Sequence, residues 1–327
     1  MIHLNLKLRK IGSIFFSIIF GFFLMFYSYN KFTDDQIEVI KDHFMKADYL
    51  YIYISMIIAI LGNVSRAYRW KYTLGYLGYK TSFGTNFMSL SIGYLMNMTI
   101  PRSGEVVRAI LIKKYNDIPF NKGFGTILAE RIVDSLILLF LVLLAFFLQF
   151  DIVKTFFFDK IPFQQIIWIL IGTIVFFFIV FYFYSYSNIR QVLQIKEKLL
   201  EVKEGVFSIV KMEHKKAFLA HTIFIWVSYV IMFYVTIFAI PEISTISFSS
   251  VLTSFIVGSI TIAITSNGFG SYPVLMAQIL FFYQVPETAA VAFGWIVWIS
   301  QMILLIVLGF LSLILLPFFN KKKSRLS

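Results

Sequence analysis

The sequence predicts an all-α polytopic membrane protein with about six transmembrane helices and two re-entrant helical hairpins in an inverted repeat. Hydrophobic residues make up 59% of the 327 residues, and 39 residues are phenylalanine. The mean hydropathy is +0.82, and a water-soluble domain of this size could not bury that much apolar surface. Two further observations support this prediction: helix-breaking polar motifs interrupt two apolar segments, and basic residues collect on one side of the expected spans.

Six apolar segments reach the length of about 20 residues that crosses a bilayer. The first follows Lys7, Arg9 and Lys10 and lacks the small residues of a cleavage site, so we expect an uncleaved span instead of a signal peptide. The longest polar run, residues 188–216, has only 29 residues and leaves no room for a separate soluble catalytic domain. The expected spans are residues 11–30, 49–70, 123–149, 162–186, 217–240 and 288–318.

Two other apolar segments, 82–100 and 248–265, each run into a broken polar motif and a short second limb. The motifs are NMTIPRSGEVVR at 97–108 and SNGFGSYP at 266–273. Backbone groups freed by such a break are costly in lipid, so we expect re-entrant hairpins. With two hairpins, both termini and 21 of the 29 basic residues lie on the cytoplasmic side. Two full crossings would instead place the basic segment 188–216 outside.

We expect a single integral membrane domain over residues 1–327, with a first repeat at 49–149 and a second at 217–318. Between them, apolar residues spaced three or four apart predict an amphipathic cytoplasmic connector at 188–216. Charge places the two hairpins on opposite faces, which is typical of transporters whose binding sites lie near mid-membrane. Matching residues lie 165 to 167 positions apart: Gly93 and Gly258, Gly104 and Gly270, Pro119 and Pro286.

The first hairpin contains the main candidates for substrate binding. Arg102 precedes a helix expected at residues 103–114, and the free N–H groups and dipole at a helix start favour a phosphate. Glu105 and Arg108 are three residues apart and can pair with each other. The alternative is that these charges only brace the hairpin or reach the lipid headgroups. The candidate residues of this hairpin are Asn97, Pro101, Arg102, Gly104, Glu105 and Arg108.

A second charged group opens the span after this hairpin, in LAERIVDSLILL. Glu130 and Asp134 are four residues apart on one helix face, and Arg131 can pair with Asp134. The matching positions in the second repeat carry no charge. We therefore expect a polar site contributed mainly by the first half, in which Glu130, Arg131 and Asp134 either bind substrate or hold helices together.

A third charged group, Arg66 and Arg69, lies in NVSRAYRW at the cytoplasmic end of the second expected span. Positive-inside anchoring, with Trp70 at the membrane interface, explains this pair as well as a funnel for lipid headgroups does. Five of the eight arginines fall within residues 66–131. Because arginine suits planar bidentate contact with phosphate, this concentration favours including Arg66 and Arg69 in the binding site.

The motif of the second hairpin, SNGFGSYP, carries no charge. Its two glycines permit a tight turn, and its Ser, Asn and Tyr side chains offer hydrogen bonds. It can line a substrate cavity or act only as a flexible break in the helix. The candidate binding residues are Asn267, Gly268, Gly270, Ser271 and Tyr272.

The ordered motifs RAYRW, GYLMNMTIPRSGEVVRAILI, ILAERIVDSLILL and TSNGFGSYP closely resemble the transmembrane, flippase-like domain of the lysylphosphatidylglycerol synthase family. The resemblance covers about residues 10–318 and is most specific at 97–108 and 130–134. It implies a multi-pass inner-membrane protein that moves an anionic or aminoacylated lipid between leaflets. The chain stops at Ser327 without the soluble aminoacyl transfer domain of the full-length synthases, so we expect no synthase activity. Ser271 and Tyr272 stand where many relatives carry Gly-Glu or Arg-Glu.

The sequence lacks the signatures of several other functional classes. It has no cysteine, no G-x4-G-K-[ST] motif and no carboxylate cluster suited to Mg²⁺, so we expect no catalytic residue, metal or cofactor. We expect a flippase-like transporter for an anionic or aminoacylated phospholipid or a polyprenyl-phosphate lipid, and not an enzyme. The alternatives are an intramembrane enzyme acting on lipid phosphates and an accessory membrane subunit. The expected partners are membrane lipids, with a separate lipid-modifying enzyme as a candidate and no nucleic acid.

Overall fold

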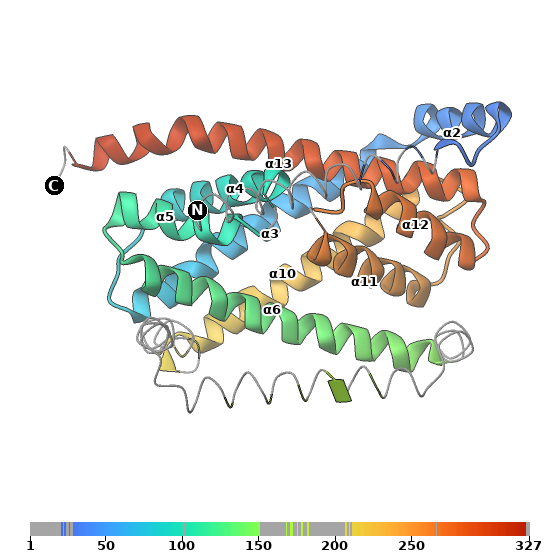
Figure 1. Ribbon diagram of the computed structural model, residues 1–327. Coiled ribbons are helices and arrows are strands. Elements are labelled where there is room, and N and C mark those ends of the chain that lie inside the picture. The colour runs from blue at the N-terminus through green and yellow to red at the C-terminus, as the bar shows by residue number, and fades with distance from the viewer. Residues whose placement is uncertain are drawn as a thin grey trace, which may run out of the picture.

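The structure is a computed structural model in which the described elements are all helices (Figure 1). This confirms the expected all-α fold. The expected spans 11–30 and 162–186, most of the connector 188–216, and Pro101 lie outside the described residues. Apart from a few single positions, the structure describes residues 29–100, 102–150, 211–265 and 267–324.

Four described helices are long and apolar enough to cross a membrane, in agreement with a multi-pass membrane protein. Each overlaps a span expected from the sequence. Asp48 caps the first of them by accepting a hydrogen bond from the Leu50 backbone N–H, and Pro119 directly precedes the second. The four helices are α3 (Tyr49–Tyr76), α6 (Phe120–Leu148), α10 (Lys215–Thr236) and α13 (Glu287–Ser324).

Two pairs of shorter helices occupy the segments where hairpins are expected. The first pair is α4 (Phe83–Thr99) and α5 (Gly104–Asn116), and the second is α11 (Phe248–Ile264) and α12 (Ser271–Phe282). The limbs of each pair pack against each other. Turns of a few residues join them, so each pair folds back on itself as the broken motifs predict.

The first hairpin depends on a close approach of two backbones. A Cβ atom added to Gly104 would lie 2.3 Å from the carbonyl oxygen of Gly93, nearer than real Cβ contacts allow. Any side chain at position 104 would therefore push α5 away from α4. In the second hairpin, a Cβ atom added to Gly258 would lie 2.7 Å from the Tyr272 ring, so small residues on both first limbs let the second limbs pack closely.

The same order of helices occurs twice along the chain. The helices α3, α4, α5 and α6 begin 165 to 167 residues before α10, α11, α12 and α13, respectively. The capping residues repeat as well: Ser82 accepts a hydrogen bond from the Thr85 backbone N–H, and Ser247 accepts one from the Ser250 backbone N–H. This regular offset extends the weak repeat in the sequence to four consecutive helices.

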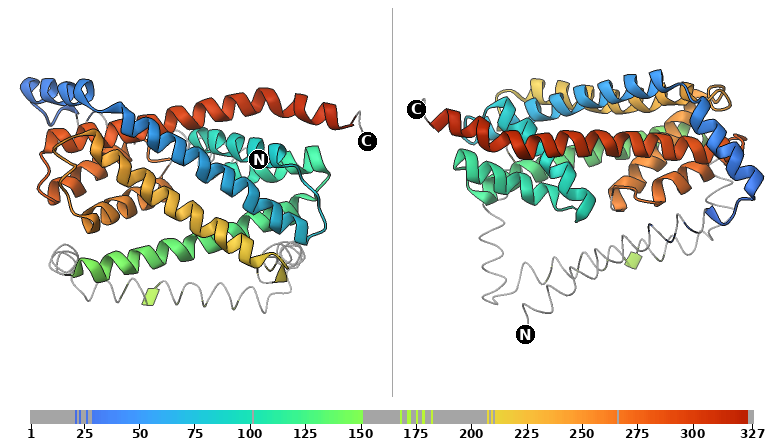
Figure 2. Two further views of the ribbon diagram at one scale, coloured as in Figure 1. Left: turned by 180° about the vertical axis from the view of Figure 1, so that it is seen from behind. Right: turned by 90° about the horizontal axis from the view of Figure 1, so that it is seen from above.

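The long helices frame the two hairpins. The helices α3 and α10 lie side by side along most of their length, which is clear when the molecule is seen from behind (Figure 2). The long helix α13 packs against α4 of the first hairpin and α12 of the second. A short helix, α2 (Asp34–Lys46), lies near the start of α13. The C-terminal half of α3 contains several buried polar residues, and two of them, Arg66 and Arg69, belong to the candidate site.

Candidate functional site

Asp134 of α6 is the centre of a buried group of ion pairs. Nη1 and Nη2 of Arg69 donate bidentate hydrogen bonds to its two carboxylate oxygens at 2.7 and 3.1 Å. Arg131 Nη2 lies 3.0 Å and Arg66 Nη2 lies 3.4 Å from Asp134 Oδ2. One carboxylate thus faces three guanidinium groups from two helices.

Glu130 lies one turn before Asp134 on the same face of α6 and contacts two further guanidinium nitrogens. Arg108 Nη2 of α5 donates a hydrogen bond to Glu130 Oε2 at 3.2 Å, and Arg69 Nε lies 3.9 Å from Glu130 Oε1. Glu130 and Arg69 are completely buried, and the Arg108 side chain is 5% exposed. The two carboxylates of α6 therefore connect α3 with the second limb of the first hairpin.

We call this set of six charged residues the arginine cluster. Arginine stays protonated in proteins, and the two carboxylates are counted at their formal charge. Four positive charges and two negative charges leave the cluster with an excess of two positive charges. Its members are Arg66, Arg69, Arg108, Glu130, Arg131 and Asp134.

Aromatic rings cover three of the guanidinium groups. The Arg108 Cζ atom lies 4.1 Å from the centroid of the Trp70 ring. Arg69 lies over Phe218 at 5.3 Å, and both contacts are within the range of cation–π attraction. Trp70 is fully buried and donates a hydrogen bond from Nε1 to Thr126 Oγ1 at 2.9 Å. Trp70 thus packs under Arg108 inside the protein and does not present its ring to the lipid, as a belt residue in the anchoring alternative would.

Arg66 and Arg69 are buried as well, with exposed fractions of 4% and 0%. This contradicts the interpretation of the pair as positive-inside surface anchors, since neither guanidinium reaches the surface. Arg69 also donates a hydrogen bond to Thr222 Oγ1 of α10 at 3.1 Å, and Arg66 lies 5.7 Å from the centroid of the Tyr229 ring. The arginines of α3 therefore bridge α6 and α10.

The tip of the first hairpin is held together by its own polar side chains. Asn97 Oδ1 accepts a hydrogen bond from the backbone N–H of Gly104 at 2.6 Å, and Ser103 Oγ donates one to the Met96 carbonyl at 3.0 Å. One of the N–H groups expected to be free for a phosphate is thus occupied. The expected anion site at the α5 start therefore lacks this donor.

The expected Glu105–Arg108 pair is absent from the described structure. Arg108 turns to Glu130 on α6 instead, because α5 packs against α6 and brings that buried carboxylate within reach. Glu105 forms no ion pair with the described residues, and its Oε2 atom is buried without a hydrogen-bond partner. The Arg131–Asp134 pair is present, as the three-residue spacing predicts.

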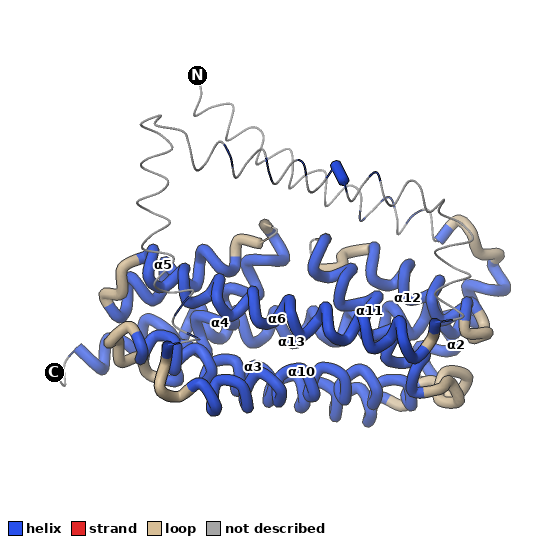
Figure 3. Tube along the Cα trace, turned by 90° about the horizontal axis from the view of Figure 1, so that it is seen from below, coloured by secondary structure: helices blue, strands red, loops and turns tan. Residues whose placement is uncertain are grey.

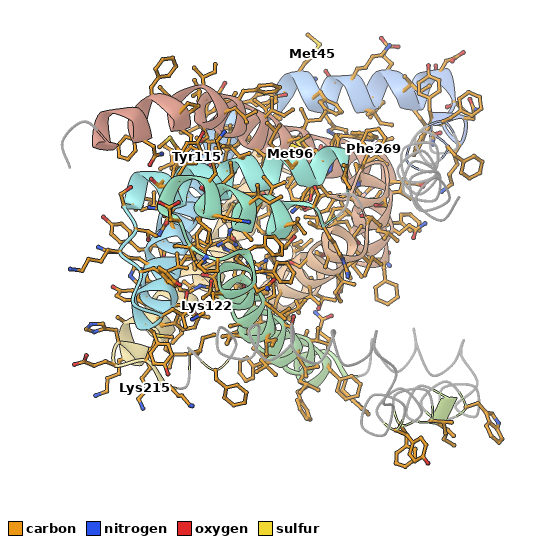
Figure 4. The ribbon with its side chains drawn as sticks, turned by 60° about the vertical axis from the view of Figure 1, so that its left-hand side comes forward. Met45, Met96, Tyr115, Lys122, Lys215 and Phe269 are labelled. Carbon is orange, nitrogen blue, oxygen red and sulfur yellow. The ribbon has the colours of Figure 1, made fainter. Side chains whose placement is uncertain are left out.

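Arg102 joins the tips of the two hairpins. Its Nη2 atom donates a hydrogen bond to the carbonyl oxygen of Ala263, near the end of α11, at 3.2 Å. Its φ angle of 58° lies in the left-handed region, which is uncommon for a residue other than glycine. Seen from below, the loop between α4 and α5 and the loop between α11 and α12 face each other near the middle of the molecule (Figure 3). Met96 and Phe269 mark the two tips in Figure 4.

Hydrogen bonds within the second tip use most of its polar groups. Thr265 Oγ1 accepts from the Gly268 backbone N–H at 3.0 Å and from Ser271 Oγ at 3.2 Å. The carbonyl oxygen of Asn267 accepts from Trp298 Nε1 at 2.9 Å. Gly270 has a φ angle of 67°, which glycine adopts without strain. The candidates in this tip therefore shape the turn and do not meet the arginine cluster.

Sequence reasoning missed several neighbours of the site, above all Thr222 and Tyr229 of α10. They are seven residues apart, so they lie on one face of that helix, and both face the arginines of α3. Polar residues at this spacing inside an apolar span are a usable signal. In the described part of the chain, no three His, Asp or Glu side chains come together as metal ligands would.

Comparison with known protein families identifies the family of this chain. Residues 11–309 match the lysylphosphatidylglycerol synthase transmembrane region. The chain belongs to this family. The match includes both hairpins and every residue of the arginine cluster, so the lysylphosphatidylglycerol synthase transmembrane fold is represented here by two repeated sets of four helices.

Two curated relatives of this family member match shorter segments. A UPF0104 membrane protein of Methanocaldococcus jannaschii is 33% identical over 96 residues, which are 28% of this chain and 29% of that protein. The glycosyltransferase AglD of Haloferax volcanii is 30% identical over 105 residues, which are 27% of this chain and 17% of that protein. The chain thus covers less than a third of the length of either relative. No solved structure matches it.

Proposed function

We propose that the protein is a flippase-like transporter that moves an anionic or aminoacylated phospholipid, or a polyprenyl-phosphate lipid, between the leaflets of the inner membrane. The observation that carries the proposal is the meeting of two hairpin tips near a buried cluster with excess positive charge. Charged residues at membrane depth are costly, and they mark substrate pathways in transporters.

The repeat supports alternating access in this proposal. Two similar units that approach from opposite ends form a pathway that opens to one side and then to the other when one unit moves against the other. Arg102 makes a hydrogen bond between the tips, and this bond to Ala263 breaks when they separate. The hairpins are then re-entrant, with both termini of the chain in the cytoplasm.

Basic residues support this orientation. Lys122 and Lys215, near the starts of α6 and α10, lie toward the same end of the molecule (Figure 4). Lys113 and Lys114 end α5 in the same region, so the limbs of the first hairpin open toward the basic end. Positive residues are more frequent on the cytoplasmic side, so this end faces the cytoplasm in our proposal.

We propose transport instead of catalysis, with any lipid modification carried out by a separate enzyme. Both carboxylates of the arginine cluster are in contact with guanidinium groups, and neither is placed as a free general base. The name of the Haloferax volcanii relative, a glycosyltransferase, applies to a protein of which this chain matches 17%. That short match gives no reason to propose glycosyl transfer here.

Leaflet exchange in vesicles tests the proposal. The purified protein is reconstituted with a fluorescent phosphatidylglycerol in one arm and a fluorescent polyprenyl phosphate in another, and the inner-leaflet fraction is followed over time. Arg108→Gln should slow exchange, whereas Lys46→Gln, an exposed change on α2, should not. If neither lipid exchanges faster with the protein than in protein-free vesicles, transport is refuted. Covalent change of either lipid would favour the enzyme alternative.

A further inference from the structure

The arginine cluster is not balanced by the charges that the described structure provides. Its excess of two positive charges lies among side chains that are 0 to 5% exposed for Arg66, Arg69 and Arg108. Glu105 is the nearest carboxylate in the sequence of α5, yet it forms no ion pair with the described residues. Uncompensated charge is expensive in a low-dielectric interior, so a bound anion would stabilise this site.

The cluster also has hydrogen-bond donors to spare. Each of its arginines has a buried Nε atom without a hydrogen-bond partner in the described chain, and Arg131 has a buried Nη2 atom of the same kind. Arg131 Nη2 lies 3.0 Å from Asp134 Oδ2, but the geometry is not that of a hydrogen bond. Buried donors normally have partners, and guanidinium groups suit the oxygens of a phosphate.

Arg131 brings the cluster to the surface of α6. The Arg131 side chain is 33% exposed, whereas the other arginines are enclosed. Leu128 and Ile132 lie three residues before and one residue after it, and both are exposed apolar side chains. A ligand that approaches Arg131 from this side therefore passes apolar surface, which fits a lipid whose chain stays in the bilayer.

We propose that the arginine cluster binds the phosphate of a lipid phosphomonoester. A phosphomonoester carries about 1.5 to 2 negative charges at neutral pH, whereas a phosphodiester carries one. The excess charge of the cluster matches the monoester and leaves one positive charge uncompensated with the diester. Among the lipids of the proposed function, this charge match favours a lipid phosphomonoester over an aminoacylated lipid, whose headgroup carries net positive charge. The inference rests on the proposed function only in naming a lipid as the occupant.

Equilibrium binding in nanodiscs of phosphatidylcholine tests this. The full-length protein is titrated with farnesyl phosphate, with its methyl ester as the matched diester, and with inorganic phosphate. We expect farnesyl phosphate to bind about tenfold or more tightly than its methyl ester, because the ester loses one negative charge and with it a charge-assisted hydrogen bond. Inorganic phosphate should bind more weakly than farnesyl phosphate. Equal affinity for monoester and diester would overturn the charge match, and equal affinity for inorganic phosphate would overturn the lipid assignment.

Matched variants locate the binding. Arg66→Gln should reduce the preference for the monoester, because it removes one unit of the excess charge. Lys71→Gln removes the same charge from an exposed position on the same helix and should leave the preference unchanged. If Arg66→Gln does not fold, Arg66→Lys keeps the charge and should keep the preference while it weakens binding of both esters. A preference unchanged in Arg66→Gln would place binding elsewhere, and a preference lost in Arg66→Lys would overturn the charge match.

This binding assay is independent of transport. Monoester preference without leaflet exchange would support the binding site and refute the flippase function. Leaflet exchange without monoester preference would refute only the identity of the headgroup. The two proposals can therefore fail separately.

Discussion

The side chain of Arg102 donates a hydrogen bond to the carbonyl oxygen of Ala263 at 3.2 Å and thereby connects two hairpins that are about half the chain apart in sequence. Arg102 belongs to the tip of the charged hairpin, and Ala263 belongs to α11 of the uncharged one. The two repeats differ at this contact: the first tip contributes a charged guanidinium, and the second contributes a backbone carbonyl that accepts its hydrogen bond.

Arg102→Ala should let the tips move apart. Loss of an exposed charged hydrogen bond favours separation by about 1 kcal/mol, roughly a fivefold change in the ratio of joined to separated tips. The chain has no native cysteine, so spin labels at exposed Ile100 and Ile264 report the distance between the tips. We expect a broader distribution with longer distances in the variant. An unchanged distribution would show that another contact holds the tips.

Asp134→Asn should strongly destabilise the protein. Three guanidinium groups contact this one carboxylate, so the amide leaves buried positive charges without a partner. Breaking a buried ion pair from one side costs about 3 to 5 kcal/mol. Unfolding in denaturing detergent measures the loss. The matched control is Asp42→Asn on α2, whose ion pair with Lys46 is exposed and contributes about 1 kcal/mol or less.

Similar stability losses in Asp134→Asn and Asp42→Asn would contradict the burial of the arginine cluster. A large loss only in Asp134→Asn, with farnesyl phosphate restoring part of it, would show that the anion and Asp134 share the same arginines. Ligand binding to the folded state raises stability by mass action.

Gly104→Ala should disrupt the first hairpin, since the new Cβ atom meets the Gly93 carbonyl oxygen at 2.3 Å. We expect a loss of about 1 to 3 kcal/mol from overpacking, together with slower leaflet exchange. Gly75→Ala is the matched control near the end of α3, where an added Cβ atom meets nothing within 4 Å. That change should be neutral or should stabilise by about 0.5 to 1 kcal/mol. Equal effects of the two changes would contradict the close approach of α4 and α5.

The sequence was sufficient to predict the helical class and the hairpins, because apolar length and helix-breaking motifs are local signals. It was also sufficient for the Arg131–Asp134 pair, whose partners are three residues apart on one helix. The Arg69–Asp134 and Arg108–Glu130 pairs span 65 and 22 residues, so no spacing rule within one helix could find them. The burial of Trp70 depends on the same packing and was missed for the same reason.

The side of the membrane on which each hairpin opens is tested by labelling single cysteines in the otherwise cysteine-free chain. Lys113→Cys, exposed at the end of α5, should react with a membrane-impermeant maleimide only from the cytoplasmic side. Glu242→Cys lies at an exposed position after α10. It should react only from the outside, because α10 runs from the cytoplasmic side to the outside of the membrane in the proposed orientation. Both positions lie in exposed segments, so neither change should alter the fold. Labelling of both from the same side would refute the inverted arrangement, and with it alternating access between the hairpins, while the ion pairs of the arginine cluster would stand.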